Sequence, residues 1–168
     1  MTQAADKDPL DDVIDRCGTW KKLKRVIMRC LLFYVRCRKR EDTADCSRLI
    51  EQAEIVLIRH CQQKEFTDDL KRLKNEEQVS ISSKLASLNP YLDESNGMIR
   101  VRGRLENADI PTDQRTPIVL PANHRVTHLL IDDIHRRNGH VGIETCRFKI
   151  AREVLAATLH LGSKENYW

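Results

Sequence analysis

The sequence has few aromatic residues and no long apolar run. Only 5% of its 168 residues are Phe, Trp or Tyr, so large core anchors are scarce. No apolar stretch approaches the roughly 20 residues that a membrane-spanning helix requires. Internal repeats and low-complexity tracts are also absent. A chain of this length can form one ordinary globular domain or two small ones. No membrane partner is expected.

The common catalytic motifs are missing as well. There is no glycine-rich phosphate loop, no GxSxG elbow and no cysteine in a catalytic setting. His124 and His128 have the spacing of a zinc peptidase helix, but the glutamate that serves as general base in HExxH is replaced by Arg125. Asp132 and Asp133 are adjacent, and on a helix they would point about 100° apart. The sequence therefore predicts a protein that is not an enzyme, and no small-molecule substrate is expected.

Cysteines occur without a CxxC pair. The six are Cys17, Cys30, Cys37, Cys46, Cys61 and Cys146. Several fall at apolar positions of helical patterns, which favours small hydrophobic residues over disulfides. The N-terminus, residues 1–9, is polar and acidic, unlike a signal or transit peptide. An intracellular location, in the cytoplasm or the nucleus, is expected.

Basic residues are plentiful in one segment. The net charge is only +4, yet residues 16–40 carry ten basic and no acidic residues. These are Arg16, Lys21, Lys22, Lys24, Arg25, Arg29, Arg36, Arg38, Lys39 and Arg40. Such a stretch attracts polyanions. A solvated helix face explains the same pattern equally well.

Helical periodicity dominates the first half of the chain. It starts near Asp11 and forms an apolar stripe that consists of Trp20, Leu23, Ile27, Cys30 or Leu31, and Tyr34. After a break at residues 41–45, where Thr43 or Asp45 could cap a helix, a second pattern runs to about residue 75. Its inward face carries Ile50, Ala53, Val56 or Leu57, His60, Leu70 and Leu73. Two long helices with a short connection predict an antiparallel pair.

The second half combines strand and helix signals. A short helix is expected over residues 84–88, and Asn96-Gly97 is a turn signal before a strand at residues 98–105. Ile99 and Val101 should share one strand face, with Arg100, Arg102 and Arg104 on the other. Residues 118–120 form a short apolar strand. A helix should follow from residues 121–123 to 138, and a last one over residues 143–159.

The predicted fold class is mostly α with a small β-hairpin (α+β), in which a long helix hairpin precedes a small hairpin and a short helical unit. Four segments are expected. Residues 1–10 form a disordered N-terminus and 11–78 a helical connector. Residues 79–116 form a linker with the β-hairpin, and 117–168 a C-terminal helical unit.

An ordered series of short motifs follows residue 88. The motifs are Leu88-Asn89-Pro90-Tyr91-Leu92-Asp93, Gly97-Met98-Ile99-Arg100-Val101-Arg102-Gly103-Arg104-Leu105, Pro117-Ile118-Val119-Leu120-Pro121, His124-Arg125-Val126-Thr127, and His135 with His140-Val141-Gly142. Upstream lie Trp20-Lys21-Lys22-Leu23, Ala53-Glu54, Leu57-Ile58-Arg59, Gln62 and Phe66. In order and spacing, this series resembles the polyproteins of BEL/Pao-class LTR retrotransposons, over roughly residues 18–155.

The resemblance implies a position between the reverse transcriptase and RNase H region and the integrase. The integrase of this family opens with a zinc-binding module held by two histidines and two cysteines, and its histidines correspond to His135 and His140. Asn138-Gly139 allows the chain to turn between them. The later CxxC pair is missing, and Cys146 and His160 are poor substitutes. Zinc is the cofactor implied, but its ligand set is incomplete, so residues 117–168 match a truncated integrase zinc-binding-like module.

The expected function is that of a polyprotein fragment of a transposable element. It would support DNA integration in the intact polyprotein without being catalytic itself. DNA or other polyprotein segments are the expected partners, and Arg100, Arg102 and Arg104 are the candidate nucleic-acid-binding residues. The basic helix could contact phosphates as well. Aromatic residues are not interleaved with these arginines or with the basic helix, which argues against a single-strand platform. The alternatives are a structural linker or degenerate relic without activity, and a helical interaction protein.

Overall fold

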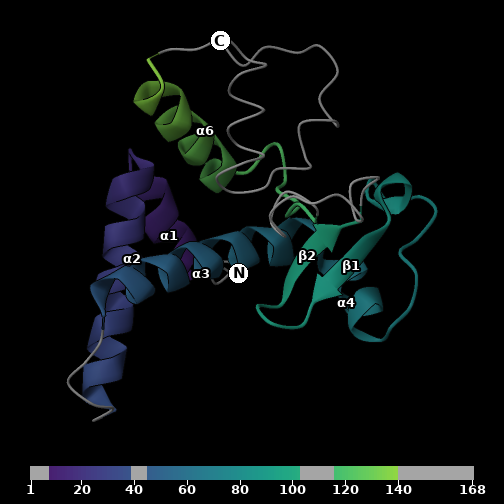
Figure 1. The fold of residues 1–168 in the computed structure, drawn as a ribbon, viewed down its shortest axis with the longest axis horizontal. Helices are drawn as coiled ribbons and strands as arrows, with labels where there is room; N and C mark the ends of the chain where they lie inside the picture. The colour runs from purple at the N-terminus through teal and green to yellow at the C-terminus, as the bar shows by residue number, and fades with distance from the viewer. Residues whose placement is uncertain (1–7, 39–44, 103–115, 140–168) are drawn as a thin grey trace, which may run out of the picture.

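The structure is a computed structural model, and it describes residues 8–38, 45–102 and 116–139. Its elements are α1 (Pro9–Arg16), α2 (Trp20–Cys37), α3 (Cys46–Glu65), α4 (Thr67–Lys74), η1 (Ala86–Leu88), β1 (Pro90–Asp93), β2 (Met98–Val101) and α6 (Arg125–Arg137) (Figure 1). The predicted class, mostly α with a small antiparallel hairpin, is confirmed. The last predicted helix, residues 143–159, lies outside the described residues.

The first predicted helix is divided into α1 and α2. Asp8 caps α1 by accepting a hydrogen bond from the Leu10 amide at 2.8 Å, and the helix ends where Cys17 adopts an extended conformation. Thr19 then caps α2 by accepting from the Lys22 amide at 3.3 Å. The prediction of one continuous helix was wrong here, because side-chain caps end and restart a helix without disturbing its apolar periodicity.

The second predicted helix is likewise divided, at Phe66. Asp45 caps α3 through the Ser47 amide, as one of the two predicted caps. Phe66 leaves the helical region of backbone space, with φ −121° and ψ 37°, and its ring is buried. The break lets the chain turn, so α4 packs beside β1 instead of continuing the line of α3 (Figure 1).

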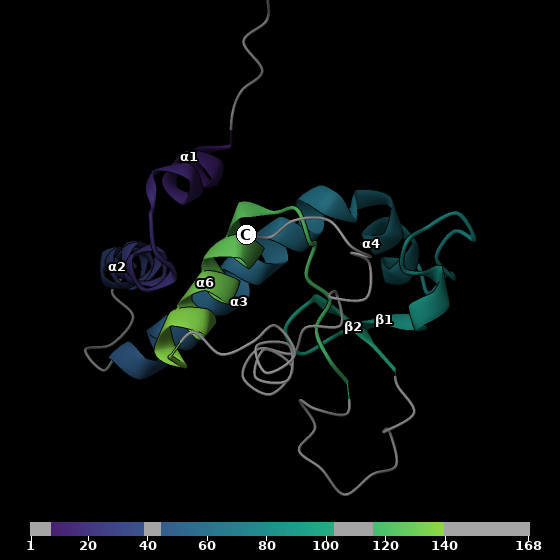
Figure 2. The ribbon, with the colours of Figure 1, turned by 90° about the horizontal axis from the view of Figure 1, so that it is seen from above.

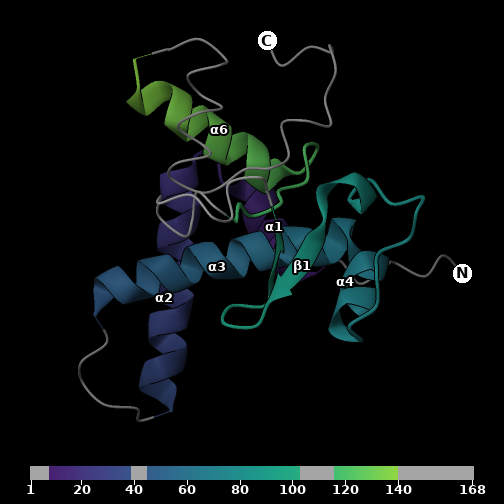
Figure 3. The ribbon, with the colours of Figure 1, turned by 45° about the vertical axis from the view of Figure 1, so that its right-hand side comes forward.

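The helices α2 and α3 cross steeply instead of lying side by side (Figures 1 and 3). Figure 2 shows α2 nearly end-on while α3 runs across the view. An ion pair between Lys24 and Glu54, 3.0 Å apart, joins the two helices near their crossing. The N-terminal half of α2 therefore lies against α3, and its C-terminal half extends past the crossing (Figures 1 and 3).

The sheet has two antiparallel strands, with Tyr91 opposite Arg100 and Leu92 opposite Ile99. Gly97 occupies the connecting turn with φ +66°, a conformation that glycine adopts at little cost. The predicted strand at residues 118–120 is reduced to a single bridge between Ile118 and Arg100. The predicted helix at residues 84–88 is a single 3-10 turn at its end, η1.

Two apolar clusters form the core of the described residues, and β2 lies between them. Met98 belongs to the larger cluster, together with side chains from α1, α2, α3, α6 and residues 118 and 120. Ile99 and Val101 belong to the smaller one, with Phe66, Leu70, Leu85 and Val119. Because α6 packs on α1, α2 and α3, residues from all three expected segments after the N-terminus share one core.

The helix α6 confirms a sequence prediction in some detail. Its predicted inward residues, Val126, Leu129, Leu130 and Ile134, are all buried. His124 caps it by accepting a hydrogen bond from the Val126 amide through Nδ1. After Asn138, Gly139 has φ +68°, so the predicted helix end is confirmed.

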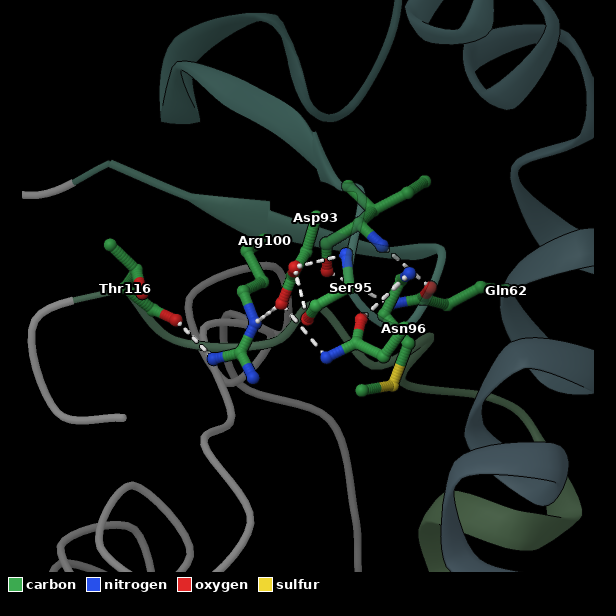
Figure 4. Close-up of polar contacts among 8 residues, drawn as sticks. Gln62, Asp93, Ser95, Asn96, Arg100 and Thr116 are labelled. Atoms are coloured by element: carbon green, nitrogen blue, oxygen red, sulfur yellow. Dashed lines mark hydrogen bonds and ion pairs between the residues drawn. The ribbon is translucent and has the colours of Figure 1, made fainter. Parts of the chain in front are cut away.

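A buried glutamine fastens β2 to α3 (Figure 4). The Gln62 side chain accepts the Ile99 amide at 2.8 Å and donates to the Ile99 and Val119 carbonyls at 3.0 and 2.7 Å. Gln62 is fully buried. The short sheet leaves backbone groups at Ile99 and Val119 without a strand partner. The side-chain amide of Gln62 supplies the hydrogen bonds that a neighbouring strand would otherwise make.

Candidate nucleic-acid interface

The solvent-facing side of α2 carries an uninterrupted set of cations. Six basic side chains are exposed, and none of them forms an ion pair with another residue that the structure describes. They are Lys21, Lys22, Arg25, Arg29, Arg36 and Arg38. We call these six residues, with Phe33 and Tyr34, the α2 basic face. The two other basic residues nearby differ, since Arg16 pairs with Asp12 and Lys24 with Glu54.

The spacing within α2 aligns most of these side chains. Lys22, Arg25, Arg29, Phe33 and Arg36 follow one another at intervals of three or four residues, so they lie along one side of the helix. The helix contains no acidic residue. Its positive dipole end adds to the charges of the first turn. The result is a rod of positive potential that spans about 20 Å along the helix axis.

The C-terminal half of α2 contributes little to the core: it has no buried residue, although the half-buried Leu31 packs against the larger cluster. All buried residues of this helix lie at or before Ile27. Phe33 is 71% and Tyr34 is 53% exposed, and the Arg38 guanidinium lies 4.6 Å from the centre of the Tyr34 ring. The prediction that Tyr34 faces inward was wrong, because α2 crosses α3 and extends beyond it.

The arginines of the predicted strand at residues 98–105 differ in their surroundings. Arg100 is only 8% exposed; its Nε donates to Asp93 at 2.8 Å and its terminal nitrogen to the Thr116 carbonyl at 2.8 Å (Figure 4). Arg102 is exposed, with its guanidinium 4.9 Å from the centre of the Tyr91 ring. Arg104 lies outside the described residues. Of the predicted arginine face, Arg102 is thus available to a ligand and Arg100 braces the hairpin.

The carboxylate beside Arg100 has a perturbed pKa. Burial alone raises the pKa of Asp93, but hydrogen bonds from Ser95 and the charge of Arg100 outweigh it. Asn96 adds a further donor at 2.8 Å. The net effect holds the pKa of Asp93 below its usual range, so the carboxylate stays charged and keeps Arg100 in place.

The predicted metal ligands are only partly within the described residues. His135 is half-buried in the last turn of α6, whereas His140 lies beyond residue 139. Within residues 8–38, 45–102 and 116–139, no group of three or more His, Cys, Asp or Glu side chains is placed to hold a metal ion. The zinc assignment therefore stays a prediction. Asp132 and Asp133 are each paired with an arginine four residues later.

A charged cluster that the sequence did not predict joins α1 to α3. Asp11 accepts hydrogen bonds from His60, at 2.7 Å, and from Lys64. The Lys64 contact, aided by His60 and opposed by burial, lowers the pKa of Asp11. His124 lies nearby, with its ring 6.5 Å from that of His60, and burial lowers its pKa. These residues lie 49 or more positions apart in sequence from Asp11, so periodicity gave no sign of the cluster.

Cysteines occupy two kinds of position. Cys17 and Cys61 are buried in the larger cluster as predicted, and burial raises the pKa of the Cys61 thiol to about 12. The interpretation as small hydrophobic residues is wrong for three others, which are exposed, namely Cys30, Cys37 and Cys46. All five are free thiols. A high pKa makes Cys61 a poor nucleophile.

One open cleft of about 490 Å³ lies between the end of α4 and β1. Its lining mixes acidic and basic side chains, including Glu76, Glu94, Lys74 and Arg102. Such a mixture matches neither an anion nor a cation, in contrast to the α2 basic face. None of the described helices is long and apolar enough to span a bilayer.

Known proteins give no direct indication of what this interface binds. No protein-family model, curated protein or solved structure matches the chain. The features that bear on function are therefore the α2 basic face, the exposed Arg102 and the motif series in the sequence. Of these, the α2 basic face has the most exposed cations that form no ion pair with another described residue.

Proposed function

We propose that the chain is a non-catalytic segment of a BEL/Pao-type retrotransposon polyprotein, from the region leading into the integrase, and that it binds nucleic acid through the α2 basic face. One observation carries the binding proposal: six exposed cations, five in α2 and Arg38 at its C-cap, form no ion pair with another described residue. The motif series, which resembles that family, supports the origin. In the intact polyprotein, this contact would support DNA integration.

Phosphate contacts explain why unpaired cations matter. Each phosphate that a protein neutralises on duplex DNA releases counterions, so the logarithm of the affinity falls with the logarithm of salt with a slope of about −0.9 per contact. Six contacts would give a slope of about −5. Cations that already pair with a carboxylate, as Lys24 and Arg100 do, would contribute little of this. Binding of this kind is strong at low salt and independent of sequence.

The test is fluorescence anisotropy with a labelled DNA duplex over a range of salt concentrations. The triple variant Arg25→Gln, Arg29→Gln, Arg36→Gln should reduce the magnitude of the slope by about one for each phosphate that is no longer neutralised. The matched control removes three exposed cations from the other end of the molecule, through Arg72→Gln, Lys74→Gln and Lys84→Gln. The proposal requires the α2 variant to change the slope more than the control.

Equal effects from both triple variants would show that net charge, not α2, governs the binding. A wild-type affinity that does not respond to salt would contradict phosphate contacts altogether. In that case the surface is a solvated helix face, as expected of a structural linker or relic. Because the substituted α2 side chains are exposed, the α2 variant should fold normally, which circular dichroism can check for both variants.

The same proposal assigns His135 and His140 to an incomplete zinc site. Structural zinc sites use four ligands, and the two histidines supply half of them. We expect a zinc titration followed by circular dichroism to give no stoichiometric ordering of the chain. Stoichiometric binding that His135→Ala abolishes would instead establish a working zinc module.

A further inference from the structure

Two aromatic side chains stand out on the α2 basic face. Among the described residues, three large hydrophobic side chains are exposed, and two of them, Phe33 and Tyr34, are adjacent in this one basic helix. The third, Ile81, lies far away on the loop after α4. Single exposed hydrophobic residues are common on protein surfaces. An adjacent aromatic pair beside six unpaired cations is a different arrangement. The two rings point about 100° apart, and each has an arginine beside it, so a flexible ligand that follows the helix surface can meet rings and charges together.

Phe33 is interleaved with the cations, so the expectation that no aromatic residue lies among the basic residues of this helix was wrong. Phe33 follows Arg29 by four residues and precedes Arg36 by three, so it lies between them on the helix surface. None of the described residues makes a ring or cation contact with Phe33. The Tyr34 ring has Arg38 beside it at 4.6 Å. Arg29 and Arg36 are about 10 Å apart along the axis, so flexible arginines flank a ring between them on both sides.

We propose that the α2 basic face prefers single-stranded nucleic acid, with Phe33 and Tyr34 stacking on unpaired bases while the flanking arginines contact phosphates. This inference rests on the nucleic-acid binding proposed above and adds the class of ligand. Stacking on aromatic side chains accepts any base, since every base has a π-face, and it is combined with cationic grooves or patches in proteins that bind single strands.

A duplex offers less to this surface. Its bases are already stacked on both sides, so an aromatic ring face has nothing to stack on without unstacking a base step. Direct reading of a duplex groove relies largely on side chains such as Asn, Gln and Arg that match base edges. The helix α2 contains no Asn or Gln, so only its arginines could contact base edges, and Phe33 would meet polar groove edges. Ring faces and base faces, by contrast, are complementary in a single strand.

A membrane surface is the main competing ligand for a helix with basic and aromatic residues. Interfacial helices separate an apolar face, which enters the lipid, from a charged one. In α2 the apolar face is already used, since Trp20, Leu23 and Ile27 are buried in the core. Of the exposed rings, Phe33 lies on the charged side between Arg29 and Arg36, whereas Tyr34 extends the apolar stripe beyond the core and has Arg38 beside it. This placement favours a polyanion whose charges and flat apolar groups alternate along its length.

The experiment measures the affinity of the full chain for three labelled ligands: a thymidine oligonucleotide, a duplex of equal length, and an abasic strand that keeps the phosphates but lacks the bases. The wild-type chain should bind the thymidine strand more tightly than the other two. Substituting Phe33→Ala and Tyr34→Ala should weaken thymidine-strand binding on the order of tenfold. The salt slope should stay unchanged, because the cations that contact the phosphates are all retained.

The abasic strand separates base stacking from phosphate contacts, because it keeps the phosphates and lacks the bases. The aromatic double variant should bind it as well as the wild type does, since the rings then have no base to stack on. Ile81→Ala serves as the matched control for losing an exposed hydrophobic side chain and should alter none of the affinities. Both aromatic side chains are largely exposed, so circular dichroism should show the double variant folded.

Two results would overturn the preference for single strands while leaving nucleic-acid binding intact: equal affinity for duplex and thymidine strand, or an equal loss on the abasic strand. Binding to phosphatidylserine-rich vesicles that the double variant loses, without any loss on thymidine strands, would assign the rings to a membrane instead. No binding to any oligonucleotide would overturn both this inference and the proposed function.

Discussion

Two arginine-bearing segments of this protein look similar in sequence and differ in the structure. In α2 and in the predicted strand at residues 98–105, basic residues lie among apolar ones, and both patterns predicted cations on a face opposite the apolar one. Arg100 of β2 is buried against Asp93, whereas Arg25, Arg29 and Arg36 of α2 are exposed. The difference teaches that the availability of a cation depends on whether the fold brings an acidic group opposite it.

The turn at Asn96-Gly97 is what creates the pair in the hairpin. It places Asp93 opposite Met98 and within reach of Arg100. No comparable partner is available within α2, which has no acidic residue, and only Lys24 reaches one on α3 among the described residues. The hairpin arginine consequently acts on stability, and the helix arginines are available for a ligand. Four changes test this contrast, from the largest expected effect to the smallest.

Gln62→Leu should lower the free energy of unfolding the most, because Gln62 joins α3 to β2, the strand that carries Arg100. It leaves two groups, the Ile99 amide and the Val119 carbonyl, without a partner in a dry core, whereas the Ile99 carbonyl still accepts from the Val119 amide at 3.1 Å. Each unsatisfied group costs about 1–3 kcal/mol, so we expect the free energy of unfolding to fall by about 4 kcal/mol. Urea denaturation measures it. A decrease below about 1 kcal/mol would mean that the two groups find other partners.

Arg100→Ala should lower the free energy of unfolding by about 3 kcal/mol, because it leaves Asp93 charged, largely buried and without its cation. Arg102→Ala is the matched control two residues along the same strand face. It removes an exposed guanidinium and its contact with Tyr91, so it should cost about 1 kcal/mol or less. Equal decreases in the two variants would contradict the distinction between a bracing and an available arginine.

Acid should weaken the fold through the same carboxylates. The pKa values of Asp11 and Asp93 are lowered below the ordinary value of 3.8. A depressed pKa contributes stability that is present above the ordinary value and is lost as the pH falls through the folded-state value. Stability measured by urea should therefore drop from about pH 4 downward. In Asp93→Asn the drop should be smaller, and an unchanged acid response would assign the effect to Asp11.

The triple variant Arg25→Gln, Arg29→Gln, Arg36→Gln should change the free energy of unfolding by about 0.5 kcal/mol or less, since the three side chains are exposed and make no described ion pair. Its effect should appear in nucleic-acid binding alone. Thermal unfolding gives the comparison with Arg100→Ala. A large decrease in stability would show that these arginines support the fold.

Much of the secondary structure followed from periodicity, but its interruptions did not. The inward residues of α6 and the hairpin turn were predicted, because spacing and turn chemistry are local. The breaks at Cys17 and Phe66 were missed, since the apolar stripe continues through them while the backbone turns. Gln62 gave no signal as a clamp, because its three partners lie 37 or 57 residues away.

The candidate interface was likewise half predictable. The cation-rich segment was evident from composition, whereas Tyr34 within it was wrongly placed inward and Phe33 was not singled out. Tyr34 continues the spacing of Trp20 and Ile27, so periodicity placed it in the core. Exposure depends on how far the neighbouring helix reaches along α2, and that length is set by the crossing with α3 (Figure 3).

The sequence by itself determined the positive charge of α2 and its lack of local neutralisation, because partners three or four residues apart can only come from the same helix. It also determined that residues 125–137 bury one face. Only the tertiary structure decided that Arg100 is neutralised and that Phe33 and Tyr34 are exposed. Both outcomes depend on which groups pack opposite a side chain, and those groups come from other elements of the fold.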